Sequence, residues 1–462
     1  MKKFFLLLLV LSFVLFGGLP FGVDESSSEP TFNFHGQFRV NSYADSREDK
    51  TMVGDFNRTA SRLRWRPTFD VEMSESVSLH TQFNIGHINS NIANAGTSFA
   101  LRHAVIQADL FDTGITGVAG LVPVSDKFGD TLFSADWDYN PLALIFLVNK
   151  GDVKIRAGLG TLQEGVEGGL GGGSALHEDD LSIYVFDADY EPLGIGGSVY
   201  WMNGGSDRGI AAGKTALGGA LGGGAMQELS LFHYGGRYSG DFEVIKVNAF
   251  LVGSNLTADG FFGAGADLKS NGVAGKIEII APINDVTVGL MITGASGDKN
   301  FGVAGTGTSS AFITPMSVAG TTGYWGYTGR LTEQGPTDTG IDDQTVNLDG
   351  GGLPWSSYAN LGLGLLTVQG KVGFPITDII GAYFGVGYYR SADAPAGQSK
   401  DIGLDVYAQA KINLGQNLNL EAGVDYLAAG KGHYNNIAAA TASGLAVSRG
   451  IFLGFSRLQL EY

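Results

Sequence analysis

Residues Asn417–Tyr426 read Asn-Leu-Asn-Leu-Glu-Ala-Gly-Val-Asp-Tyr, with an apolar or small residue at every second position. Successive side chains of a β-strand point to opposite faces of the sheet. This stretch therefore predicts a strand with one apolar and one polar face. The same period recurs in residues 32–40, 286–292 and 402–412. The sequence thus predicts an all-β protein built from amphipathic strands.

The connections between the expected strands alternate between tight and long. Tight turns are expected at Ser74–Ser76, Asp112–Gly114, Asn149–Asp152, Asp189–Pro192, Ser239–Asp241, Pro282–Asp285, Pro375–Asp378 and Gly415–Asn417. Long connections separate them, among them Ser125–Asn140 and Ala295–Trp355. The pattern predicts about 18 strands, within a range of about 16 to 18, with short turns on one side and long loops on the other. A closed antiparallel transmembrane β-barrel over residues 31–462 leaves no unpaired sheet edge in lipid.

The composition excludes several other classes of protein. The chain has 72 glycines, 16% charged residues and no Cys. Glycine without a three-residue period excludes collagen, and a hydrophobic content of 44% is too high for a disordered chain. The absence of Cys excludes a disulfide framework. A net charge of −17 argues against a nucleic-acid partner, since phosphate binding needs concentrated Lys and Arg.

The first residues resemble a secretory signal. Lys2 and Lys3 precede an apolar run from Phe4 to Phe16, followed by small residues. The run is shorter than the about 20 residues of a spanning helix, so residues 1–22 are predicted to be a signal peptide. No other stretch is long and apolar enough to span a membrane as a helix. Export to the cell envelope is therefore expected.

Several short stretches resemble a known family. Residues 450–462 end in Leu458, Leu460 and Tyr462, similar to the C-terminal signal of outer-membrane barrels. Residues 34–40, 62–67 and 77–83 resemble the opening strands of Gram-negative outer-membrane porins of the general and alginate-export kinds. The resemblance implies a location in the outer membrane, contact with its lipid and a homotrimer.

A set of basic residues is expected to face the lumen, because charge on the lipid side would cost about 2–4 kcal/mol per residue at mid-depth. These residues are Arg39, Arg62, Arg64, Arg66, Lys154 and Arg156. The loop Ser125–Asn140 carries Asp126, Asp130, Asp136 and Asp138, which would lie across from them if the loop folds inward as the third loop of general porins does. The arginines would then favour anions. The alternative is that they stiffen the wall by pairing with those aspartates.

Other motifs point to no enzyme and no cofactor. Gly209–Thr215 is one residue short of a phosphate-binding loop, and the catalytic motifs of zinc proteases and serine hydrolases are absent. The segment His177-Glu-Asp-Asp could bind a divalent cation, but the favoured interpretation is a solvated acidic loop. The loop Ala295–Trp355 could cap the pore, contact neighbouring protomers or bind a ligand.

The combined expectation is a porin that admits small hydrophilic solutes or ions by passive diffusion. The first alternative is a substrate-specific channel for anionic sugars or organic acids. The second is a barrel that sheathes a partner protein such as an electron-conduit cytochrome, which requires a lumen too wide for its own loops to close. An enzyme or a secreted adhesive β-protein fits the sequence less well.

Overall fold

The computed structural model describes residues 30–45, 58–89, 98–110, 113–135, 139–163, 181–204, 228–260, 267–301, 307–314, 326–328, 362–431 and 450–462. The predicted signal peptide, residues 1–22, lies outside these ranges. Within them, no helix is both long and apolar enough to cross a membrane. Almost all regular structure in the described ranges is β-strand.

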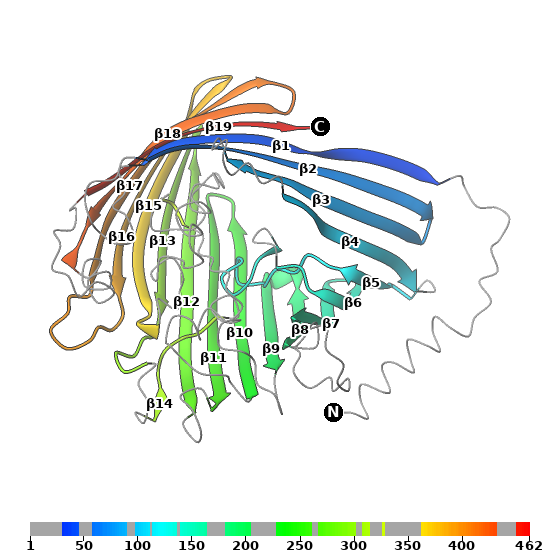
Figure 1. The fold of residues 1–462 in the computed structure, drawn as a ribbon, viewed down its shortest axis with the longest axis horizontal. Coiled ribbons are helices and arrows are strands. Elements are labelled where there is room, and N and C mark those ends of the chain that lie inside the picture. Colours follow the sequence, from blue (N-terminus) through cyan, green and yellow to red (C-terminus); the bar gives the residue numbers. More distant parts are fainter. Residues whose placement is uncertain are drawn as a thin grey trace.

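The strands form one sheet that curls round on itself (Figure 1). They are β1 (Thr31–Asp45), β2 (Arg58–Ser74), β3 (Val77–Asn89), β4 (Ser98–Leu110), β5 (Ile115–Leu121), β6 (Leu142–Lys150), β7 (Val153–Gln163), β8 (Leu181–Tyr190), β9 (Ile195–Gly204), β10 (Glu228–Phe242), β11 (Ile245–Asp259), β12 (Leu268–Ile283), β13 (Val286–Ala295), β14 (Thr308–Ser309), β15 (Leu365–Thr377), β16 (Ile380–Ser391), β17 (Asp401–Gly415), β18 (Leu418–Ala429) and β19 (Gly450–Glu461). The two-residue β14 lies parallel to β12, and the others pair antiparallel with their neighbours.

The first and last strands close the barrel. β1 pairs with β19 from Gln37 opposite Glu461 to Asp45 opposite Leu453. Of the 19 strands in the sheet, β14 is the additional one, which leaves 18 in the wall. The prediction of a closed antiparallel barrel of about 18 strands is therefore confirmed.

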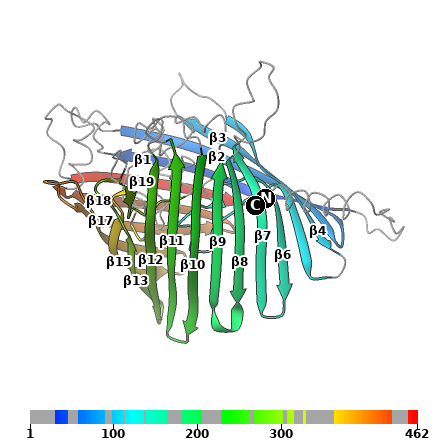
Figure 2. The same ribbon diagram turned by 90° about the horizontal axis from the view of Figure 1, so that it is seen from below.

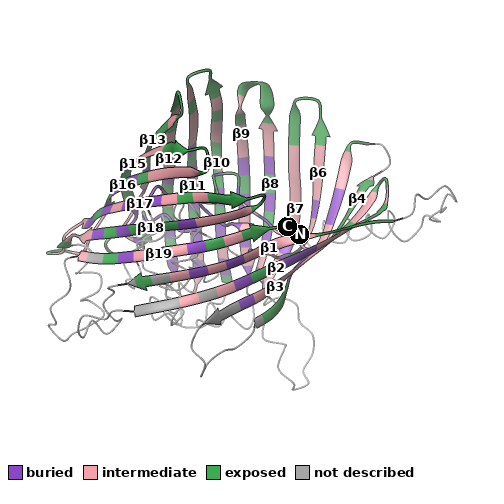
Figure 3. Cartoon of the chain, turned by 90° about the horizontal axis from the view of Figure 1, so that it is seen from above, coloured by how far each residue is buried: buried purple, intermediate pink, exposed green. Residues whose placement is uncertain are grey.

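The two faces of the wall differ in polarity, as the alternating burial along strands such as β8 and β17 shows (Figure 3). Large apolar side chains such as Phe34, Tyr234 and Phe452 are exposed on the outer face. Buried polar side chains face inward; they include Arg39, Thr68, His103, Asp187, Ser198, Asp405, Gln409, Glu421, Asp425 and Arg457. A soluble protein would show the opposite distribution, whereas a barrel in lipid requires this one.

Short turns gather at one end of the wall, as Figure 2 shows for β6–β7, β8–β9 and β10–β11. The expected turns match the observed ones except between β10 and β11. The predicted turn at Ser239–Asp241 is wrong, because β10 continues to Phe242, opposite Ile245. The chain reverses at Glu243 and Val244, where Glu243 adopts a left-handed conformation (φ 53°). The polar Ser-Gly-Asp stretch is part of the strand.

Candidate functional site

Three rows of polar side chains cross β19, β1 and β2 in register. The rows are Arg457–Asn41–Arg62, Gln459–Arg39–Arg64 and Glu461–Gln37–Arg66. Residues two apart along a strand share a face, so the three rows face the same way. Arg39 is 3% exposed and Arg64 is 9% exposed. The side chain of Arg62 lies outside the described part of the structure, but its backbone position fits the first row.

Glutamine side chains orient the two arginines of the second row. Arg39 Nε donates a hydrogen bond to Gln459 Oε1 at 3.0 Å. Arg64 Nη2 donates to Gln37 Oε1 at 2.8 Å. A glutamine fixes the direction of a guanidinium but does not neutralise it. These two contacts hold the guanidiniums of Arg39 and Arg64 against the wall.

A β-bulge adds Arg102 to this basic surface. On β4, His103 lies opposite Gln82 and Leu101 lies opposite Phe83, so Arg102 is the extra residue between them. Two consecutive residues can then face the same side, and both Arg102 and His103 are buried. Arg102 Nη1 donates to Gln82 Oε1 at 2.6 Å. We refer to Arg39, Arg64, Arg66, Arg102 and Arg457 as the arginine ladder.

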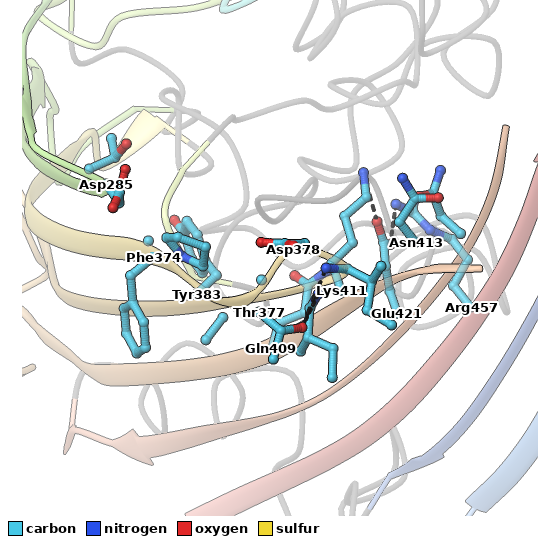
Figure 4. A pocket seen from close by; sticks show the side chains of 18 residues that line it. Asp285, Phe374, Thr377, Asp378, Tyr383, Gln409, Lys411, Asn413, Glu421 and Arg457 are labelled. Atoms are coloured by element: carbon cyan, nitrogen blue, oxygen red, sulfur yellow. Dashed lines mark hydrogen bonds and ion pairs between the residues drawn. The ribbon is translucent and has the colours of Figure 1, made fainter. Parts of the chain in front are cut away.

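Arg457 borders a second part of the lumen, a cavity of about 870 Å³ beside β15–β19 (Figure 4). Its guanidinium pairs with Glu421, whose Oε1 is also 3.7 Å from Lys411 Nζ. Gln409, Asn413 and Tyr383 add hydrogen-bonding groups to the lining. The turn residues Asp285 and Asp378 place this cavity toward the short-turn end of the barrel. The alternation of Leu458, Leu460 and Tyr462 could have identified Arg457 as inward-facing.

Lys154 and Arg156 do not belong to the ladder. Lys154 pairs with Glu191 at the short-turn rim, where both side chains are half exposed. Arg156 Nε contacts Asp187 Oδ2 at 2.6 Å, and its Nη2 donates to the carbonyl oxygen of Ser125 at 2.8 Å. The sequence left open that the arginines pair with aspartates of the loop Ser125–Asn140. Arg156 does pair with an aspartate, but this one, Asp187, belongs to the wall. Arg156 also anchors the inserted loop.

The loop between β5 and β6 folds into the lumen. The amide of Lys127 donates to Tyr200 Oη on β9 at 2.9 Å, and the ring of Phe128 packs against Tyr200 and Phe250. Arg102 Nη2 donates to the carbonyl oxygen of Ala135 at 2.6 Å. The loop is therefore attached to the wall on both sides. Figure 1 shows it inside the ring of strands.

One aspartate of this loop, Asp126, is arranged differently from the expectation. Asp126 is buried and accepts hydrogen bonds from the amides of Phe128 (2.5 Å), Leu132 (2.5 Å) and Phe133 (2.9 Å). Burial raises its pKa to about 7, although these amides oppose the shift. The expectation that Asp126 faces the arginines is therefore corrected. Its carboxylate oxygens accept hydrogen bonds from the loop's own turn instead. Asp130 lies half-buried in that turn, and Asp136 and Asp138 lie outside the described residues.

A piece of the long connection before β15 also enters the lumen. The amide of Tyr327 donates to Gln369 Oε1 at 2.7 Å, and its hydroxyl bonds to Glu278. Thr328 Oγ1 donates to Asp405 Oδ2 at 2.6 Å. Residues 308–314 of the same connection lie against β10–β12, where His233 Nε2 is 2.7 Å from the carbonyl oxygen of Ile313. The described parts of this loop thus narrow the lumen.

Comparison with known proteins adds evidence on the fold. No protein-family model and no curated protein matches the chain. Solved structures match it over nearly its whole length. Acinetobacter baumannii OccAB1 is 8% identical, covers 95% of this chain and 99% of its own, with a TM-score of 0.53. Pseudomonas aeruginosa OccK2, solved in complex with glucuronate, is 10% identical, covers 93% and 98%, with a TM-score of 0.52. The chain has the fold of an outer-membrane porin.

Within this porin fold several lumen carboxylates contact inserted segments of the chain or wall arginines. Asp126 holds its own loop, Asp405 and Glu278 hold the Tyr327–Thr328 segment, and Asp187 pairs with Arg156. Among the ladder members, Arg39 and Arg64 contact glutamines and Arg457 contacts Glu421. In the described ranges, no group of three or more His, Asp or Glu could hold a metal ion. The His177-Glu-Asp-Asp segment and the Gly209–Thr215 stretch lie outside them.

Proposed function

We propose that the chain is an outer-membrane channel that conducts small hydrophilic solutes and favours anions. The observation that carries the proposal is the register of β19, β1 and β2, which stacks Arg457, Arg39, Arg64 and Arg66 on one strip of the lumen wall. Rings of arginine and lysine select anions in channels. Low-dielectric walls strengthen their field by excluding water on one side.

The substrate class we propose is a small solute that carries a carboxylate, such as an anionic sugar or an organic acid. A guanidinium presents two parallel N–H donors to a carboxylate, so stacked arginines offer successive binding positions along the lumen. The structure of OccK2 in complex with glucuronate, a sugar acid, supports this choice by analogy of fold. This makes the substrate-specific channel a better-supported proposal than unselective diffusion.

The sheath alternative has less support. A sheath must leave its lumen open for a partner protein, whereas here two segments of the chain enter it. Phe128 packs against Phe250, and Thr328 is buried against Asp405. Four further expectations stay predictions: residence in the outer membrane, cleavage of residues 1–22, assembly as a homotrimer and the absence of enzymatic activity.

The experiment that tests the proposal is solute uptake into liposomes that contain the purified protein. We expect glucuronate to enter faster than glucose, which has the same ring but no charge. The double substitution Arg39→Gln and Arg64→Gln should lower the rate of glucuronate uptake about tenfold and leave the rate of glucose uptake unchanged. The reason is that each arginine–carboxylate contact contributes roughly 1 kcal/mol or more.

The matched control is Lys246→Gln with Lys269→Gln. It also removes two positive charges, but from half-exposed ion pairs with Asp241 and Asp267 at strand ends. The control should transport glucuronate at the unmodified rate. Equal rates for glucose and glucuronate in the unmodified protein would contradict the anion preference. Absence of uptake of either solute would contradict the channel itself.

A further inference from the structure

Amide side chains on the inner wall of β17 and β18 continue the second row of the arginine ladder. The register places Asn413 of β17 opposite Asn419 of β18, and Asn419 opposite Gln459 of β19. Gln459 lies opposite Arg39 of β1, which lies opposite Arg64 of β2. The two asparagines and the two arginines therefore belong to one row across five strands.

Asn413 and Asn419 line the cavity of about 870 Å³ beside β15–β19, together with Gln409 (Figure 4). We call this space the amide cavity, after these three side chains. Gln409 Oε1 accepts a hydrogen bond from Tyr407 Oη at 2.8 Å, and Asn413 Oδ1 accepts one from the amide of Gly415 at 3.2 Å. Within the part of the chain that the structure describes, the three amide nitrogens donate no hydrogen bond. The cavity thus offers three donors to a solute.

The charges of the amide cavity disfavour a carboxylate as its occupant. Its lining carries three carboxylates and two cations, which are Asp285, Asp378, Glu421, Lys411 and Arg457. Glu421 already pairs with Arg457, and its Oε1 lies 3.7 Å from Lys411 Nζ. A second carboxylate would therefore meet more negative than positive charge, whereas an uncharged group would not. The occupant that fits is a neutral group with several hydrogen-bonding atoms.

The chemistry of the lining matches a sugar ring. An amide side chain can donate and accept hydrogen bonds, as a sugar hydroxyl does. Tyr383 of β16 lies opposite Gln409 and packs edge-on against Tyr407, with ring centroids 5.8 Å apart. Its aromatic side chain adds an apolar surface, on which the C–H face of a sugar can pack. On the same strand, nothing lies within 4 Å of the position that a Cβ of Gly381 would occupy, so the lining leaves room there.

We propose that the amide cavity binds the hydroxyl-bearing ring of a sugar, so that the channel prefers sugar acids to carboxylates without hydroxyl groups. The preference among acids rests on the proposed function, which assigns the carboxylate to the arginine ladder, whereas binding of the ring does not. Asn419 and Arg39 lie two strands apart, about 10 Å between backbones. Arg39 leans across this gap, because its Nε donates to Gln459 on the strand between them. One solute can therefore reach both kinds of contact.

The first test measures binding of glucose, which carries the hydroxyls but no carboxylate. Glucose is added in steps to single channels in a planar bilayer, and the fall of the ion current gives the concentration of half-saturation. All proteins are compared at the same glucose concentrations, so that the effect of glucose on the conductivity of the solution cancels. We expect a saturable fall in the unmodified protein, and the same fall in Arg39→Gln/Arg64→Gln.

The decisive variant is Asn413→Ala with Asn419→Ala. Loss of the two amides should raise the half-saturation concentration about three- to tenfold, since each removes a hydrogen bond to the sugar. The matched control is Asn255→Ala with Asn271→Ala, which also removes a cross-strand asparagine pair, on β11 and β12. Asn255 follows the buried Ser254 and therefore faces outward. This control should bind glucose as the unmodified protein does.

A second variant, Gly381→Leu, keeps all three amides and fills the cavity from β16. It is needed because Asn413 also holds the turn at Gly415. We expect Gly381→Leu to weaken glucose binding at least threefold or so, by occupying the open space beside Gly381. Migration of the folded form on unheated gels checks that each variant is a closed barrel.

The second test compares the uptake of glucuronate and cyclohexanecarboxylate into liposomes, after subtraction of uptake into liposomes without protein. Both solutes have a six-membered ring and one carboxylate, but only glucuronate has hydroxyls. Glucuronate should enter faster, and Asn413→Ala/Asn419→Ala should narrow the difference.

The inference would be overturned by a fall of current without saturation in the unmodified protein. An unchanged half-saturation concentration in both Asn413→Ala/Asn419→Ala and Gly381→Leu would overturn it as well. Failure of the proposed function gives a different result: glucuronate would enter no faster than glucose, although glucose would still bind. Faster entry of glucuronate than of glucose, without saturable glucose binding, would remove the sugar-ring inference alone.

Discussion

The guanidinium of Arg102 donates a 2.6 Å hydrogen bond to the carbonyl oxygen of Ala135, which joins the arginine ladder directly to the loop that narrows the lumen. The same guanidinium is held by Gln82 on the neighbouring strand. On the other side, Arg156 donates to the carbonyl of Ser125. Two wall arginines thus anchor the two ends of one inserted loop.

Arg102→Gln should loosen this loop. A hydrogen bond from a charged donor contributes about 1.5–3 kcal/mol, but the Arg156 anchor stays in place. We therefore expect backbone amides of residues 126–135 to exchange with deuterium about three- to tenfold faster. The matched control is Lys154→Gln, which removes a positive charge at the rim, from the ion pair with Glu191. Equal exchange in Arg102→Gln and Lys154→Gln would show that Arg102 does not hold the loop.

Asp126 should make stability depend on pH. Burial raises its pKa to about 7, whereas the ordinary value is 3.8. Between these values the folded protein keeps a proton that the unfolded chain releases. The contribution of this carboxyl to stability is therefore complete below the unfolded pKa and is lost as the pH rises through the folded pKa. The temperature at which the folded form is lost should fall between about pH 4 and pH 8, and Asp126→Asn should flatten that fall. An identical slope in both proteins would contradict the assignment.

The last residue should strengthen the closure of the barrel. Trp65 Nε1 on β2 donates to Tyr462 Oη at 2.6 Å, across β1. We expect Trp65→Phe and Tyr462→Phe each to lower the free energy of unfolding by about 1 kcal/mol, and the double variant to lose little more than either one. Urea titration of folding into lipid vesicles provides the three values. Fully additive losses would mean that the two side chains act independently.

The sequence predicted what depends on local pattern. Alternation in residues 417–426 identifies β18, and turn-forming residues such as Asn284 and Asn417, both with positive φ, mark where strands reverse. Inward-facing Arg39, Arg64 and Arg66 follow from the same alternation. Strand count and closure follow from the regular spacing, because a long sheet with one apolar face is stable only when its edges meet.

Features that depend on contacts between distant residues could not be predicted from the sequence pattern. The bulge at Arg102 depends on the partner strand, so alternation could not show that Arg102 and His103 both face inward. The carboxylate of Asp126 is captured by amides of its own turn only after the loop folds. His35, Asp70, His80 and His103 contact one another in sequence across four strands, although His35 and His103 are 68 positions apart. No local period carries that information.

The most direct test of anion preference is the reversal potential of single channels under a salt gradient at neutral pH. If the arginine ladder faces the conducting path, the unmodified protein favours chloride over potassium. Arg39→Gln/Arg64→Gln should then lower that ratio by about two- to fivefold, while Lys246→Gln/Lys269→Gln leaves it unchanged. Cation selectivity in the unmodified protein, or a ratio unaffected by loss of Arg39 and Arg64, would contradict the proposed function.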